Sequence, residues 1–144
     1  MLVADILHHK GNGIVAIATT ATIDQAAKLL TDRRIGALVV RDRLGRLAGM
    51  FSERDIVAAL AHHGPAARTM AVGEVMTRDV LTCKPGDAVR DIMALITQRR
   101  VRHLPVVEGE RLVGVISIGD VLKSRLDEKE HEVQVLRDIS RVRS

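Results

Sequence analysis

Two stretches of the chain, residues 22–34 and 87–100, place apolar side chains at the spacing of an amphipathic helix. In each stretch apolar residues recur every three or four positions, which gathers them on one face of a helix with about 3.6 residues per turn. Thr22 and Gln25 have the pattern of an N-terminal capping box, and Pro85-Gly86 supplies the turn before the second stretch. The predicted buried stripes are Ile23, Ala26, Ala27, Leu29 and Leu30 in the first helix and Val89, Ile92, Met93, Leu95 and Ile96 in the second.

Near-continuous runs of Val, Leu and Ile follow each of these helices and predict pairs of strands around tight turns. Such runs are typical of strands that are buried on both faces. We expect strands at residues 35–40, 47–51, 101–107 and 112–116, with shorter strands before the helices at residues 14–18 and 80–84. We expect further helices at residues 3–7, 53–62, 72–76 and 118–126, and a turn-rich loop at residues 8–13.

These elements occur twice in the same order, so the chain is predicted to be a tandem repeat. Leu38 and Leu104 are 66 residues apart, whereas Asp55 and Asp120 are 65 apart, which means that one residue is lost in the hairpin turn between them. Chance does not produce such a register. We therefore divide the chain into repeat 1 (residues 1–71), repeat 2 (residues 72–126) and a C-terminal segment (residues 127–144). The length suits one modest domain or two small intertwined modules.

The C-terminal segment has a different character from the repeats. It is rich in charge, and its apolar residues Val133, Leu136, Ile139 and Val142 keep helical spacing. A narrow stripe buries little surface by itself, so we expect an amphipathic helix that packs on the body or on another subunit. A frayed tail is the alternative.

Composition narrows the class of protein. Hydrophobic residues make up 47% of the chain, which supports a packed core, and no run of 18 uncharged apolar residues predicts a membrane span. The N-terminus lacks the layout of a signal peptide. Cys83 is the single cysteine, which fits a reducing cytoplasm, and its strand-like setting favours a small core residue over a nucleophile.

The net charge of +4 does not favour nucleic acid as a partner. The arginines are scattered among acidic residues instead of forming a stripe, and Phe51 is the single aromatic residue, so unpaired bases would lack a stacking platform. The same arginines suit phosphate-bearing small molecules.

One motif recurs where a strand meets a helix: a glycine, then a serine three residues later, then an aspartate three residues after that. It places Ser52 and Asp55 in repeat 1 and Ser117 and Asp120 in repeat 2. A helix N-terminus presents free N–H groups, and an ionised aspartate there can accept two hydrogen bonds from a vicinal diol such as a ribose. In the alternative interpretation the motif is only a capping box. Capping is favoured for a single copy, and two copies in register strengthen the case for a binding site.

The order helix, strand, helix, strand, strand, helix, with this motif at the last junction, resembles a tandem pair of cystathionine-β-synthase (CBS) domains. Residues 101–107 followed by residues 112–117 match the second- and third-strand pattern of that family closely, as does Val75-Met76-Thr77 at the entry to repeat 2. Repeat 1 departs from the pattern at Val39, where the family often has the proline seen here as Pro105. The resemblance covers residues 3–126.

This resemblance implies an α+β (α/β-like) fold in which two repeats pack by their sheets around a pseudo-two-fold axis, with the C-terminal helix added. Two clefts then lie between the repeats. Such modules typically bind adenine nucleotides (AMP, ADP, ATP, sometimes NAD, NADH or S-adenosylmethionine) and act as regulatory sensors without catalysis of their own. They often form flat homodimers, and the downstream protein target is not identified by the sequence.

By the same resemblance, Asp55 and Asp120 would hold ribose hydroxyls with Ser52 and Ser117 nearby. The candidate phosphate ligands are Arg54, Arg102 and His103. Gly119 stands in repeat 2 where Arg54 stands in repeat 1, so the two sites are expected to differ. The candidate walls around adenine are Ile17, Ile35, Gly36, Ala37, Met50 and Phe51 in repeat 1 and Cys83, Val101, Leu104, Pro105 and Ile116 in repeat 2. The candidates to bond the edge of the base are Thr19, Thr20, Thr82 and Lys84.

An enzyme, a metal site and a structural module are the alternatives to a nucleotide sensor. An enzyme is disfavoured because the spacings suggest no Ser-His-Asp arrangement, no P-loop and no dinucleotide glycine fingerprint. A metal site is disfavoured because the adjacent pairs His8-His9 and His62-His63 cannot point the same way on a regular helix. The main alternative to a nucleotide sensor is a structural or protein-interaction module whose clefts stay empty.

Overall fold

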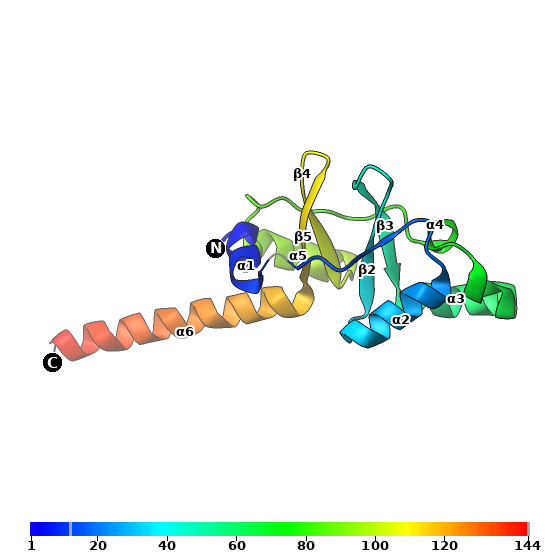
Figure 1. The fold of residues 1–144 in the computed structure, drawn as a ribbon. Helices are drawn as coiled ribbons and strands as arrows, with labels where there is room; N and C mark the ends of the chain where they lie inside the picture. Colours follow the sequence, from blue (N-terminus) through cyan, green and yellow to red (C-terminus); the bar gives the residue numbers. More distant parts are fainter. Residues whose placement is uncertain (12, 144) are drawn as a thin grey trace.

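The computed structural model describes residues 1–11 and 13–143; Asn12, in the predicted loop at residues 8–13, lies outside the described residues. The two repeats follow one another along the chain, and the turns of their hairpins β2–β3 and β4–β5 project at the top of Figure 1. Repeat 1 contains α1 (Val3–Lys10), β1 (Ala16–Ala18), α2 (Ile23–Arg33), β2 (Ala37–Arg41), β3 (Leu47–Ser52), α3 (Glu53–His63) and the 3-10 helix η1 (Gly64–Thr69). Repeat 2 contains α4 (Val72–Val75), α5 (Val89–Arg99), β4 (His103–Glu108), β5 (Arg111–Ser117) and the start of α6 (Ile118–Arg143).

The strand register repeats as the sequence predicts. In repeat 1, β2 pairs antiparallel with β3 so that Ala37 lies opposite Ser52. In repeat 2, β4 pairs antiparallel with β5 so that His103 lies opposite Ser117. Both hairpins carry an irregularity at the same place, after Val40 in one and after Val106 in the other. The equivalent bulges confirm the duplication at the level of backbone pairing.

The prediction of a strand at residues 80–84 is wrong. In repeat 1, β1 runs parallel to β2, and the amide of Val39 donates to the carbonyl of Val15 at 3.4 Å. In repeat 2, only Cys83 forms a bridge, receiving a hydrogen bond from the amide of Val107 at 2.9 Å and donating one to the carbonyl of Pro105 at 3.0 Å. Pro105 replaces Val39 at the equivalent position and has no N–H to continue the ladder, so the pairing stops at one residue.

The strands β1, β2 and β4 each begin two residues later than predicted, and two larger differences concern helices. The loop expected at residues 8–13 begins later, because residues 8–10 complete the last turn of α1. The helices expected at residues 118–126 and in the C-terminal segment form one continuous helix, α6. Its first turns are anchored by buried Val121 and Ser124, and the rest extends away from the body in Figure 1.

The first helix of each repeat packs in the core of the other repeat. Val3 and Ile6 of α1 are buried with Ile92 and Leu104 of repeat 2. Val72 of α4 is fully buried in the core of repeat 1. Reciprocal backbone hydrogen bonds hold the exchange, from the amide of Val3 to the carbonyl of Asp87 at 2.9 Å and from the amide of Val72 to the carbonyl of Ala21 at 2.7 Å. The two repeats are therefore interlocked.

The exchange brings the chain after α4 against β3. Met50 and Thr77 exchange backbone hydrogen bonds of 3.0 and 2.9 Å. The approach is close enough that a Cβ added at Gly49 would lie 2.5 Å from the carbonyl oxygen of Thr77. A residue with a side chain at position 49 would push Thr77 away, so this glycine lets repeat 2 meet the end of β3.

Candidate functional site

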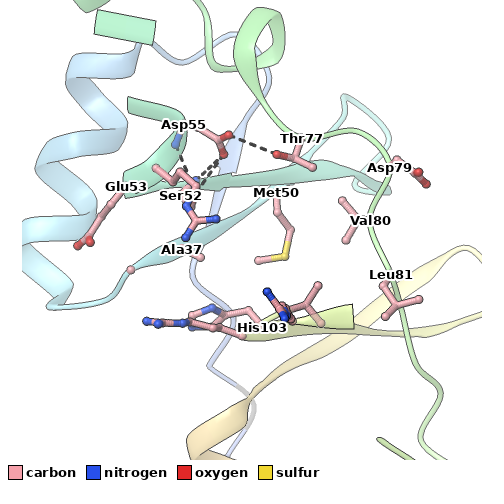
Figure 2. Close-up of a pocket in the computed structure, with 15 residues that line it drawn as sticks. Ala37, Met50, Ser52, Glu53, Asp55, Thr77, Asp79, Val80, Leu81 and His103 are labelled. Carbon is pink, nitrogen blue, oxygen red and sulfur yellow. Dashed lines mark hydrogen bonds between the residues drawn. The ribbon is translucent and has the colours of Figure 1, made fainter. Parts of the chain in front are cut away.

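A cleft of about 460 Å³ lies where the two repeats meet. Repeat 1 contributes the start of β2, the end of β3 and the first turn of α3, and repeat 2 contributes residues 77–81 and 100–103. Figure 2 shows Ser52, Asp55 and Thr77 on one side, His103 on the other, and the side chain of Met50 between them. The volume lies in the range of small-molecule sites in proteins.

Ser52 and Asp55 form a capping box at the N-terminus of α3. The amide of Ser52 donates to Oδ2 of Asp55 at 2.9 Å, and the amide of Asp55 donates to Oγ of Ser52 at 3.4 Å. Capping is therefore one function of the motif, and it uses a single carboxylate oxygen of Asp55. The other oxygen, Oδ1, accepts from the Thr77 hydroxyl at 3.3 Å, which is longer than a usual O–H···O hydrogen bond. This oxygen has capacity for a stronger donor.

Three arginines line the same cleft: Arg54 on α3, and Arg100 and Arg102 before β4. Glu53 and Asp79 also line it, so the cationic groups are interspersed with acidic ones. Guanidinium groups bind phosphate oxygens through paired hydrogen bonds. The cleft thus combines a carboxylate suited to a diol with cations suited to an anion.

His103 lines the cleft at the start of β4. Burial lowers the pKa of His103 below its ordinary value, the positive charges of Lys10 and Arg102 lower it further, and Asp120 opposes them. The imidazole is consequently neutral at pH 7, since the ordinary histidine pKa is about 6.5. His103 offers one donor and one acceptor to a ligand, and no charge.

Arg100 has an uncommon backbone conformation. Its φ is 54°, in the left-handed region, and Arg34 at the equivalent place in repeat 1 has the same value. Each ends a helix at a position where glycine is usual, because a side chain there costs roughly 1 kcal/mol or more. Arg100 also lines the cleft, so the backbone turn that ends α5 is part of the site.

The structure gathers nine of the sequence-predicted site residues in this cleft. They are Gly36, Ala37, Met50, Ser52, Arg54, Asp55, Val101, Arg102 and His103. The cleft also contains six residues that the sequence analysis did not assign to it, namely Glu53, Thr77, Asp79, Val80, Leu81 and Arg100. The repeated arginine pairs at residues 33–34 and 99–100 were the signal that could have identified Arg100.

Five predicted wall residues are buried and do not line the cleft. They are Phe51, Cys83, Leu104, Pro105 and Ile116. Alternation along β3 and β4 turns Phe51 and Leu104 to the core side. Ile116 pairs with Leu104 on that side, and Cys83 packs in the same core as Leu104. Burial raises the pKa of the Cys83 thiol to about 12, with a contribution from Asp87, so the thiol is not a nucleophile at neutral pH.

The remaining predicted residues lie outside this cleft. Ile17 and Ile35 are half-buried against the core of repeat 1, and Thr19, Thr20, Thr82 and Lys84 do not line the cleft. Ser117 and Asp120 lie at the equivalent junction of repeat 2, and Asp120 there is bonded to Lys10.

Two further observations concern residues 1–11 and 13–143. No three His, Cys, Asp or Glu side chains come together there as metal ligands would. No helix in this part of the chain is both long enough and apolar enough to cross a membrane.

The chain is similar to several proteins of one family. It is 32% identical over 142 residues to the CBS domain-containing protein CBSX3, mitochondrial, of Arabidopsis thaliana, covering 93% of this chain and 69% of that protein. The crystal structure of the CBS-domain containing protein ATU1752 from Agrobacterium tumefaciens has a TM-score of 0.80 and 41% identity, covering 86% of this chain and 92% of that one.

A second similar structure contains ligands. It is the CBS domain pair of protein MJ0100 in complex with 5′-methylthioadenosine and S-adenosyl-L-methionine, with 29% identity and a TM-score of 0.75. The alignment covers 90% of this chain and 98% of that one.

The family model of the CBS domain matches residues 3–62 and again residues 72–127. The two matches correspond to the two repeats, each with its strand hairpin and the capping-box helix that follows it. The chain therefore belongs to the CBS domain family and carries two CBS domains in tandem.

Proposed function

We propose that this chain is a regulatory module that binds an adenine nucleotide in the cleft between its repeats and has no catalysis of its own. One observation carries the proposal: the cleft combines the available Oδ1 of Asp55 with the guanidinium groups of Arg54, Arg100 and Arg102. A ligand that bears both a vicinal diol and a phosphate matches that pair of features.

The lining suggests a place for each part of the nucleotide. The ribose hydroxyls donate to Asp55, displacing the long contact from Thr77. The phosphate lies toward the arginines. The base lies between small and aliphatic residues of both repeats, which are Gly36, Ala37, Met50, Val80, Leu81 and Val101. Contacts from both repeats would make their relative position sensitive to the ligand, which is what a sensor requires.

The arginines favour AMP, ADP, ATP or a dinucleotide such as NAD or NADH over a cationic ligand such as S-adenosylmethionine. The related MJ0100 domain pair, which was solved with 5′-methylthioadenosine and S-adenosyl-L-methionine, supports the adenosine part of the proposal. The phosphate part rests on the three arginines of this chain. A separate protein target would respond to the bound state, and the single buried Cys83 suits a reducing compartment such as the cytoplasm.

Exposed apolar residues on α3 and α6 support a homodimer. Val57 is 67% exposed on α3, and Leu126 and Leu136 are 62% and 65% exposed on α6. Single exposed apolar side chains are ordinary, but Leu126 and Leu136 recur along one helix, α6, which extends away from the body. We propose that a second copy covers these helices.

The Asp55→Asn variant separates ligand binding from helix capping. Asparagine keeps an acceptor for the cap, so the free energy of unfolding should change little. It replaces a charged acceptor with an amide, so affinity for both AMP and adenosine should fall by about 1.5–3 kcal/mol. Calorimetric titration measures the affinities. Asp87→Asn is the matched control, because Asp87 also caps a backbone amide, that of Lys84 at 2.8 Å, outside the cleft. AMP binding that is unchanged in Asp55→Asn would reduce the motif to a helix cap.

The Arg100→Gly variant tests the phosphate contact. Glycine relieves the left-handed backbone, so the protein should gain about 1 kcal/mol of stability. The same variant should lose about 1 kcal/mol of AMP affinity while adenosine binding stays unchanged, because only the phosphate contact is removed. Arg34→Gly is the matched control: its stability should rise by the same amount, and its affinity for AMP should not change. Equal losses for AMP and adenosine in Arg100→Gly would exclude the phosphate role.

Truncation after Leu126 should weaken the proposed homodimer, because it removes Leu136 and the exposed face around it. Sedimentation of the full and shortened chains at micromolar concentration measures the effect. Leu44→Ala is the control, since Leu44 is 75% exposed in the hairpin turn and lies off the two helices. A full chain that sediments as a monomer under these conditions would contradict the dimer.

A further inference from the structure

The second repeat has the same capping box, but its aspartate is already paired. The amide of Ser117 donates to Oδ2 of Asp120 at 2.8 Å, and the amide of Asp120 donates to Oγ of Ser117 at 3.1 Å. The ammonium of Lys10 lies 2.7 Å from the same Oδ2 and also donates to the carbonyl of Val115 at 3.0 Å. In the cleft described above, Asp55 contacts the Thr77 hydroxyl at 3.3 Å, whereas Asp120 contacts a cation.

The difference originates in the lengths of two equivalent helices. α4 ends at Val75, so the chain leaves it in time for the backbone of Thr77 to pair with Met50. α1 begins at the equivalent residue but continues to Lys10. The carbonyl of Val115, which is equivalent to Met50, therefore receives the Lys10 side chain in place of a backbone amide.

The pairing changes the charge that a ligand would meet. Burial opposes ionisation of Asp120, but the hydrogen bond and charge of Lys10 and the bonds from Ser117 hold its pKa below the ordinary value. Asp120 is thus an ionised carboxylate whose charge is balanced within the protein. Lys10 and the capping amide both use Oδ2, so a ribose diol that approaches Oδ1 meets a carboxylate whose charge the ammonium already balances. Gly119 stands where repeat 1 has Arg54, so this helix offers no arginine to bind a phosphate in compensation.

We infer that Lys10 closes the second strand–helix junction to a nucleotide by pairing with Asp120, so that the chain binds one nucleotide, in the cleft that contains Asp55. Lys10 acts here as a specificity-determining residue that sets the number of ligands per chain. The inference rests on the proposed function, which gives the one occupied cleft. The closure itself is tested by the difference in the number of ligands bound between the Lys10 variants and the wild type.

The test is calorimetric titration of the full chain with AMP, reporting the number of ligands bound per chain. The wild type should bind one, and Lys10→Met should bind two, because methionine keeps the length of the side chain without the charge. Lys10→Ala provides a second variant with the same expected gain. Lys10→Arg should keep the ion pair and bind one. Lys123→Met is the matched control, because Lys123 lines the neighbouring hollow with Lys10 and should add no site when replaced.

The added site should depend on the freed aspartate, so the double variant Lys10→Met/Asp120→Asn should return to one ligand. Two ligands on the wild type, or no gain in either Lys10→Met or Lys10→Ala, would overturn the inference. Weaker AMP binding in both Lys10 variants would also overturn it, since Lys10 would then be a ligand contact. A wild type that binds none would contradict the proposed function, and a gain of one in Lys10→Met would still support the closure.

Discussion

The exchange of the first helices between the repeats is the constraint on which the rest of the structure depends. α1 completes the core of repeat 2, and α4 completes the core of repeat 1. Burial of one Val or Ile side chain contributes roughly 1.5–3 kcal/mol, so Val3 and Ile6 of α1 alone are significant against the marginal stability of a small domain. Neither repeat has a complete core without the other, and the surface where they meet is held in place. The cleft forms at that surface.

The site follows from the same exchange. The chain that leaves α4 must cross β3, where Gly49 permits close approach, and the crossing places the Thr77 hydroxyl beside the carboxylate of Asp55. A duplicated motif would give two similarly bonded aspartates if the exchanged helices had equal lengths. The lengths differ, because α1 continues to Lys10, and the ammonium of Lys10 reaches Asp120 at the second junction. Small differences in the repeats thus give one polar junction that is available and one that is satisfied internally.

Much of the fold could be predicted from the sequence, because periodicity and register are local properties of the chain. Residue spacing predicts the capping box of Thr22 and gives capping as the alternative interpretation at Ser52 and Ser117, and the structure shows the capping hydrogen bonds at all three. The strand at residues 80–84 was predicted wrongly because its partner has no N–H at Pro105, which is a pairing effect that the strand's own residues do not reveal. Phe51 and Leu104 were expected at the ligand, but strand alternation buries them. Thr77 and Lys10 reach their sites through tertiary contacts that spacing along the chain does not reveal.

The central claim, that the chain binds an adenine nucleotide, is tested most directly by thermal unfolding with AMP, ADP, ATP, NAD, NADH and S-adenosylmethionine. A ligand present at about 100 times its dissociation constant stabilises the native state by about 2.7 kcal/mol. The account predicts that at least one phosphate-bearing nucleotide raises the unfolding midpoint by several degrees, and by more than S-adenosylmethionine does. An unfolding midpoint indifferent to all six compounds would contradict it and would favour a structural module with empty clefts.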